Sequence, residues 1–165
     1  MIPKYKDRTQ IVANMLNPAY CAEILRSAIK AYNKESKNHI PFELLFLILP
    51  LILNNRFYDK LPKTTKKKFY EWFEENDIVK IYLSHQIKNL VPYTKEALLF
   101  LIYHEVVSIS DDGNIVYNTK FRAKKVKYID NNKQKKIIKK SELIGRWLTN
   151  IGDSITIYAT IGIRP

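Results

Sequence analysis

The side chains best suited to chemistry in this sequence are basic, and they are concentrated in one short stretch. Ten Lys and Arg residues between positions 120 and 140 face a single acidic residue, Asp130, which leaves a net charge of +9. Such a density of cations binds phosphate groups, and phosphate contact positions a protein on nucleic acid without reading its sequence. We therefore predict non-specific contact with the backbone of double-stranded DNA. The ten residues are Lys120, Arg122, Lys124, Lys125, Lys127, Lys133, Lys135, Lys136, Lys139 and Lys140.

The distribution of charge favours a contact surface over a solvated face. The chain carries 28 basic and 16 acidic residues, a formal net charge of +12, but residues 1–119 carry 16 against 13 and residues 141–165 are neutral. AT-rich codon usage alone would spread lysine along the whole chain. The charge leaves open whether the partner of residues 120–140 is DNA or an acidic protein. Phe121 and Tyr128 fit either base stacking or anchoring to the core, and we favour anchoring.

No arrangement of catalytic residues is apparent in the sequence. The four glycines are isolated, so there is no phosphate-binding glycine loop, and the three histidines are scattered. Cys21 and His85 lie on apolar helical stripes, as core residues do, and Glu43 begins a helix and is expected to face solvent. Asp111 and Asp112 precede a turn glycine, and we interpret them as turn-forming residues in preference to metal ligands. We predict a non-enzymatic protein that uses no metal and no cofactor.

The elements that position these residues are mostly helices. Asn17 is a good N-cap and Pro18 a favoured first helical residue, and an apolar stripe follows at helical spacing. Residues 41–53 are apolar on nearly all sides, which predicts a buried helix, with Pro50 kinking or breaking it near its end.

The second half of the sequence mixes helices with a hairpin. Residues 106–117 predict a β-hairpin around an Asp-Gly turn. Gly145 lies inside a predicted helix, where it indicates close packing. The apolar alternation of residues 154–163 fits a strand or a helix. Further helices are predicted over residues 64–75, from 77 to an end at Pro92, from a Thr94 cap to 105, and over 141–151. The helix from residue 77 is expected to turn Ile78, Ile81, Tyr82 and His85 toward the core.

These elements predict a mainly α fold of the α+β class, a compact multi-helix domain with a winged-helix-like β-hairpin in its second half. A generic α+β domain with one hairpin is the alternative. A DNA-reading helix would expose basic or amide groups to the groove, and the helix over 94–105 offers few, so we expect a winged helix here to bind protein. The expected organisation is a single domain (1–165) with a helical core (17–90), a winged-helix-like helix and hairpin (93–118), a basic arm or loop (119–140), and a C-terminal helix with an apolar tail (141–165).

The sequence predicts a cytoplasmic protein without a membrane partner. The N-terminus lacks the apolar region of a signal peptide. The longest apolar run, residues 42–53, is too short to cross a bilayer and contains Glu43 and Pro50.

Several stretches, taken together, resemble one protein family. They are residues 17–20 (NPAY), 41–53 (PFELLFLILPLIL), 94–98 (TKEAL), 145–147 (GRW) and 162–165 (GIRP). In this order and spacing, the chain from residue 17 to 165 resembles the small middle component of three-component bacterial conflict systems built around an ABC/SMC-like ATPase. The Lamassu anti-phage systems belong to this group.

The resemblance implies an accessory subunit that bridges an SMC-like ABC ATPase and a nuclease-type effector, with the catalytic groups in those partners. The subunit would help to hold the effector inactive until DNA engages the ATPase. The basic segment 120–140 matches no family motif, so DNA contact rests on charge alone. The residues expected to serve packing or protein interfaces are Asn17, Pro18, Gly145, Arg146, Trp147, Gly162, Arg164 and Pro165. The alternatives are a stand-alone winged-helix DNA-binding regulator and, less favoured, a small toxin or nuclease.

Overall fold

A short helix with no charged side chain lies at the centre of the fold. The structure, a computed structural model, describes residues 3–121 and 132–163. Helix α3 (Leu45–Leu53) follows a 3-10 turn at Phe42–Leu44, and seven of its residues, Pro50 among them, are buried. Helices α2 (Pro18–Ser36), α6 (Asp77–Tyr103) and α7 (Asn132–Leu148) pack around it. The predicted buried helix is confirmed, and it ends three residues after Pro50.

Helix α2 forms as its local sequence predicts. Asn17 caps it, since its Oδ1 accepts hydrogen bonds from the backbone N–H of Ala19 at 2.9 Å and of Tyr20 at 3.2 Å. Pro18 occupies the first helical position, where its missing N–H costs nothing. Cys21 lies in the buried stripe, as predicted.

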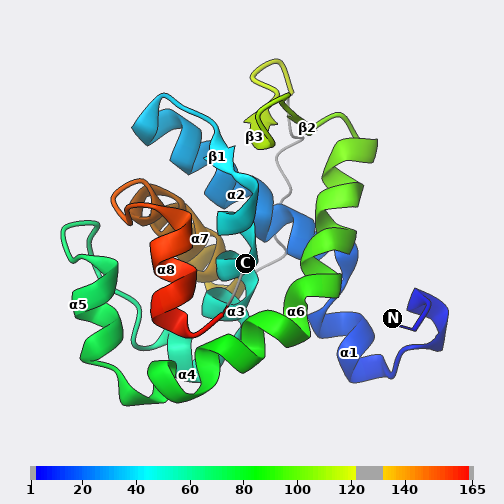
Figure 1. Cartoon of the computed structure of the whole chain (residues 1–165). Helices are drawn as coiled ribbons and strands as arrows, with labels where there is room; N and C mark the ends of the chain where they lie inside the picture. The colour runs from blue at the N-terminus through cyan, green and yellow to red at the C-terminus, as the bar shows by residue number, and fades with distance from the viewer. Residues whose placement is uncertain (1–2, 122–131, 164–165) are drawn as a thin grey trace.

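Helix α6 is one continuous helix, so the prediction that a helix ends at Pro92 and another starts at Thr94 is wrong. Proline removes a backbone donor and crowds the carbonyl four residues earlier, which bends a helix without always ending it. Figure 1 shows the two halves of α6 meeting at an angle. Both halves bury apolar side chains, including Leu83 before the bend and Leu101 after it. This packing keeps the chain helical through the proline.

The buried stripe of the first half of α6 also differs from the prediction. The core-facing residues are Val79, Leu83 and Ile87, at a spacing of four. The predicted stripe of Ile78, Ile81, Tyr82 and His85 is exposed instead. Both stripes have helical spacing, and the tertiary contacts of α6 decide between them.

The β-hairpin is confirmed and belongs to a small sheet. Strands β2 (Val107–Ile109) and β3 (Asn114–Tyr117) are antiparallel, and β1 (Ile40–Pro41) pairs with the other edge of β3, which gives the order β1-β3-β2. Ile40 and Ile115 are paired and fully buried, so they join the sheet to the helical core. The fold is therefore mainly helical and of the α+β class, as predicted. Its assignment as a winged helix stays a prediction.

The remaining elements correct the predicted boundaries. Helix α5 (Phe69–Glu74) is shorter than the predicted helix over 64–75, and helix α4 (Asn55–Tyr58) is additional. Helix α7 begins nine residues before the predicted start at residue 141. The C-terminal segment is a helix, α8 (Ser154–Ile161), and not a strand. Near the N-terminus, a 3-10 turn (Tyr5–Asp7) and α1 (Gln10–Met15) precede α2.

None of the helices within residues 3–121 and 132–163 combines the length and apolar character needed to cross a lipid bilayer.

Candidate functional site

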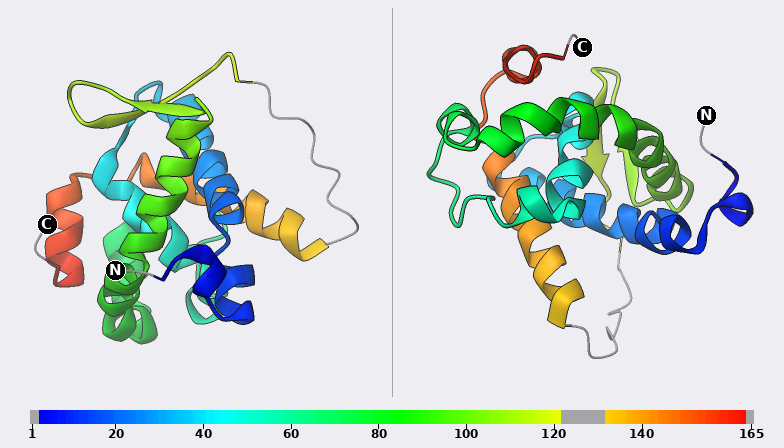
Figure 2. Two further views of the ribbon diagram at one scale, coloured as in Figure 1. Left: turned by 90° about the vertical axis from the view of Figure 1, so that its right-hand side faces the viewer. Right: turned by 90° about the horizontal axis from the view of Figure 1, so that it is seen from below.

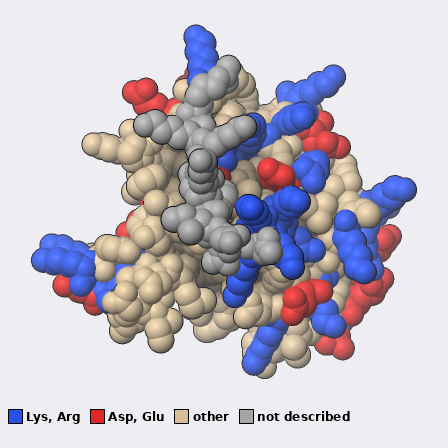
Figure 3. Space-filling view, turned by 180° about the vertical axis from the view of Figure 1, so that it is seen from behind, with Lys and Arg blue, Asp and Glu red and all other residues tan. Residues whose placement is uncertain are grey.

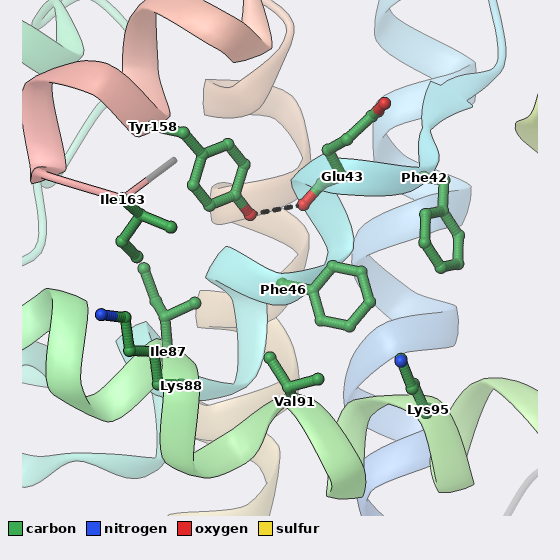
Figure 4. A pocket seen from close by; sticks show the side chains of 9 residues that line it. All are labelled: Phe42, Glu43, Phe46, Ile87, Lys88, Val91, Lys95, Tyr158 and Ile163. Atoms are coloured by element: carbon green, nitrogen blue, oxygen red, sulfur yellow. Dashed lines mark hydrogen bonds between the residues drawn. The ribbon is translucent and has the colours of Figure 1, made fainter. Parts of the chain in front are cut away.

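An apolar groove lies where three segments distant in sequence meet (Figure 4). It has a volume of about 300 Å³. The 3-10 turn and α3 form one wall, α6 the floor, and the C-terminal segment around α8 the remaining side. We call it the docking groove. Its lining residues are Phe42, Glu43, Phe46, Ile87, Lys88, Val91, Lys95, Tyr158 and Ile163.

The walls of the docking groove are held by specific contacts. The rings of Phe42 and Phe46 meet edge to face with centroids 5.1 Å apart. The Tyr158 hydroxyl donates a 2.6 Å hydrogen bond to the backbone oxygen of Glu43, which fastens α8 to the 3-10 turn. Burial raises the pKa of the Tyr158 hydroxyl well above its usual value, so this donor stays protonated. The groove is a built feature of the fold.

Two cations flank this apolar surface. Lys88 and Lys95 lie seven residues apart on α6, are exposed, and form no ion pair with any residue in the described ranges. The carboxylate of Glu43 points away from both lysines in Figure 4. An apolar hollow with lysines at its edge suits an apolar side chain flanked by carboxylates. The lining contains no Ser, Cys or His that could act as a nucleophile or base.

The predicted basic segment lies elsewhere on the molecule. Lys120 is exposed just after β3, while Arg122, Lys124, Lys125 and Lys127 lie outside the described residues. Exposed lysines also occupy the first half of α7, which projects from the body in both views of Figure 2. They are Lys133, Lys135, Lys136 and Lys139.

Lys140 differs from its neighbours on α7. It is half-buried, with its Nζ 5.7 Å from the centre of the Tyr58 ring. Burial lowers its pKa, and the nearby Lys63 lowers it further. Lys140 therefore contributes to packing more than the exposed lysines do.

The residues predicted to serve packing or interfaces separate into four groups. Gly145 and Trp147 are buried in the core, where the Trp147 Nε1 donates a 2.6 Å hydrogen bond to the backbone oxygen of Lys67. Arg146 is half-buried, and Gly162 ends α8 in a left-handed conformation with φ +78°. Asn17 and Pro18 form the N-terminal cap of α2 described above. Arg164 and Pro165 lie outside the described residues.

The remaining chemical candidates are dispersed. Glu43 is exposed, as predicted, and so are Asp111 and Asp112 in the hairpin turn. His85 is exposed too, which makes the prediction of a core histidine wrong. Across residues 3–121 and 132–163, no three His, Cys, Asp or Glu side chains gather in a way that could hold a metal ion.

Cys21 is buried, and its titration provides a test of the core. Burial, and less strongly the Glu96 carboxylate, raise the thiol pKa from 9.0 to about 12. Between these values the unfolded chain releases the thiol proton while the folded chain keeps it, so the thiol's contribution to stability is lost as pH rises. We expect it to lower the free energy of unfolding by about 1.4 kcal/mol between pH 8 and pH 10.

The measurement is urea unfolding at both pH values for the wild type and for Cys21→Ala. Other groups titrate in the same range, so the difference between the two proteins isolates the thiol. An equal loss of stability with pH in both proteins would show that Cys21 does not contribute.

Sequence reasoning missed the docking groove. Its aromatic wall comes from residues 42–46, its lysines from residues 88–95, and its third side from residues 158–163. The available signal was the pair Phe42 and Phe46, four residues apart in an otherwise aliphatic stretch.

Comparison with known families gives a match over almost the whole chain. Residues 5–165 match the model of a family described as ABC-three component (ABC-3C) system Middle Component 3. Neither the curated proteins nor the solved structures contain a match to this chain.

Proposed function

This chain belongs to the Middle Component 3 family of ABC-three component systems, and from that membership we propose that it is a non-catalytic accessory subunit. In this proposal it bridges an SMC-like ABC ATPase and a nuclease-type effector in the bacterial cytoplasm, in a Lamassu-type anti-phage system. The docking groove carries the proposal, because it offers an apolar surface flanked by two exposed lysines, which suits a segment of a partner protein.

The occupant of the docking groove is a segment of another component, with an apolar anchor side chain and acidic residues on both sides of it. A hollow of about 300 Å³ accommodates one or two large side chains. Lys88 and Lys95 supply charge complementarity at its edge, which sets orientation and excludes basic segments. The ATPase is the component we assign to it.

Double-stranded DNA is the second proposed partner. Lys120 and the exposed lysines of α7 would contact backbone phosphates without reading sequence. The projection of α7 from the body supports this proposal, because it leaves those side chains accessible to a bulky duplex.

The groove proposal predicts the effect of reversing its charge. In Lys88→Glu/Lys95→Glu, recovery of the ATPase with the tagged chain should fall at least tenfold, because acidic flanks of the partner would meet carboxylates. Phe46→Ala should weaken recovery as well, since it removes part of the apolar wall. The measurement is a pull-down from cells that express the complete operon, with mass spectrometry of the co-purified proteins.

The matched control is Lys63→Glu/Lys66→Glu, which makes the same charge change at two exposed positions outside the groove. It should retain the ATPase. Equal recovery with the groove variant and the wild type would remove the groove as the docking site. Recovery of the wild-type chain alone, retained on DNA, would instead support the stand-alone winged-helix regulator.

A further inference from the structure

A second hollow lies at the C-terminal end of α2, and its lining residues differ in chemistry from those of the docking groove. It has a volume of about 450 Å³ and lies between the last turns of α2 and the chain from β3 to residue 121. Lys30, Lys34 and Lys37 line one side, and Tyr117 and Phe121 are among the residues on the other. We call it the lysine hollow.

The three lysines lie close together at the end of α2. Lys30 and Lys34 are four residues apart on the same face of the helix, about 6 Å apart along its axis, and Lys37 is the C-cap residue directly after the last turn. All three are exposed, and none pairs with an acidic residue in the described part of the chain. Such a row suits successive phosphates of an extended nucleic-acid strand.

Among the basic residues along α2, the unpaired ones in the described part of the chain are those that line the hollow. One turn before Lys30, Arg26 is neutralised by Glu23 through two hydrogen bonds of 2.6 Å. Lys37 caps α2 in a left-handed conformation, φ +58°, which a glycine adopts more easily. The sequence thus places an ammonium group where the backbone alone would favour glycine.

Aromatic rings complete the hollow. Tyr117 and Phe121 are half-buried, so their rings are fixed by the fold and partly open to solvent. Proteins bind single-stranded nucleic acid with basic and aromatic side chains together. The basic side chains contact the phosphates, and the unstacked bases stack on the rings. A duplex keeps its bases stacked and is too wide to enter a hollow of this size. Figure 3 shows the face opposite to that of Figure 1, where many Lys and Arg side chains, with Asp and Glu side chains among them, lie on one half.

We propose that the lysine hollow binds single-stranded nucleic acid, with phosphates on Lys30, Lys34 and Lys37 and a base against Phe121. The inference rests on the nucleic-acid contact in the proposed function and adds a separate site for unpaired strands. Duplex DNA would lie on α7, while a frayed end or loop would enter the hollow.

The test is fluorescence polarisation of the full chain with a labelled oligo-dT over a series of salt concentrations. In Lys30→Gln/Lys34→Gln/Lys37→Gln, the slope of log affinity against log salt should decrease by about 2, since each phosphate contact on a single strand contributes about 0.7. Lys63→Gln/Lys66→Gln/Lys68→Gln removes the same charge from exposed positions elsewhere. It should leave the slope unchanged.

A second variant tests base stacking. Phe121→Leu keeps an apolar side chain against the core but removes the ring, and we expect a loss of roughly fivefold to a hundredfold in oligo-dT affinity. Circular dichroism verifies that both hollow variants fold. Unchanged affinity in both variants overturns the proposal.

Three further outcomes separate this inference from the proposed function. If Lys133→Gln/Lys135→Gln/Lys136→Gln loses duplex binding but keeps oligo-dT binding, both sites stand. If the wild type binds neither duplex nor single strand, the DNA contact of the proposed function fails together with the hollow. If polyglutamate displaces oligo-dT as effectively as unlabelled oligo-dT does, the hollow is a site for an acidic protein and the proposal is wrong.

Discussion

Gly145→Ala should lower the free energy of unfolding by about 3 kcal/mol, although alanine is the better helix former by roughly 1 kcal/mol. Helix α7 lies directly against the backbone of α2 at this residue. A methyl group there would lie 2.8 Å from the carbonyl carbon and 2.9 Å from the Cα of Ala28, and closer still to its carbonyl oxygen. These are backbone atoms of the buried part of α2, which cannot move aside as a flexible side chain can. The two helices would have to separate.

Urea unfolding of Gly145→Ala measures this cost, and Gly113→Ala is the matched control. Gly113 has φ +76° and open space around the position of a Cβ atom, so alanine there meets backbone strain without a clash. We expect the control to lose only about 1 kcal/mol. If Gly145→Ala is as stable as the wild type, the helices do not approach as closely as the structure indicates.

The crossing at Gly145 also explains which parts of the fold were predictable. A glycine inside a helical pattern is a local signal that a neighbour comes close, and that prediction is confirmed. The cap of α2 was equally local, because Asn17 and Pro18 satisfy the first turn by themselves. In such cases the residue type and its neighbours in sequence decide the structure.

The errors arose where tertiary contacts decide between two acceptable local patterns. Pro92 bends α6 instead of ending it, because both halves bury side chains against the core. For α8 the sequence left strand and helix open: the alternating isoleucines fit a strand, yet Ile157, Tyr158 and Ile161 are buried at helical spacing. The Asp153 side chain caps this helix by accepting from the Thr156 N–H at 3.0 Å. That cap is the local signal that could have distinguished the helix from a strand.

The proposed binding surfaces also differ in how far the sequence alone could predict them. The basic segment was visible because ten basic residues lie within 21 positions, whereas Lys30, Lys34 and Lys37 are separated by apolar, polar and acidic residues. Their charge is also masked in the composition, since residues 1–119 are nearly balanced. The docking groove could be found only from the three-dimensional structure, because no local pattern links Phe46 to residues more than 40 positions later in the chain.

The second large effect is expected at the ion pair that holds the N-terminal segment against α6. The Arg8 side chain is only 1% exposed, and its Nη2 donates to Glu96 Oε1 at 2.7 Å. It also donates to the backbone oxygens of Pro3 at 3.1 Å and Leu16 at 3.3 Å. The hydrogen bond that Arg8 donates to Glu96 raises the Arg8 pKa further above its already high value. Arg8 therefore links residues 3–16 to α6.

Arg8→Met should cost about 3 kcal/mol, because it leaves the Glu96 carboxylate without its counterion. The other oxygen of Glu96, Oε2, is buried and already lacks a hydrogen-bond partner within the described residues. Once Arg8 is replaced, no other contact of Glu96 within these residues stabilises its negative charge. The loss should be local first: backbone amides of α1 should exchange with solvent much faster, while those of α2 and α7 stay protected. Hydrogen exchange by mass spectrometry distinguishes the two regions.

Glu96→Gln in the same background should recover part of the stability, because the neutral amide is cheaper to bury than an unpaired carboxylate. Unchanged exchange in Arg8→Met would mean that the apolar contacts of the segment hold it without the ion pair.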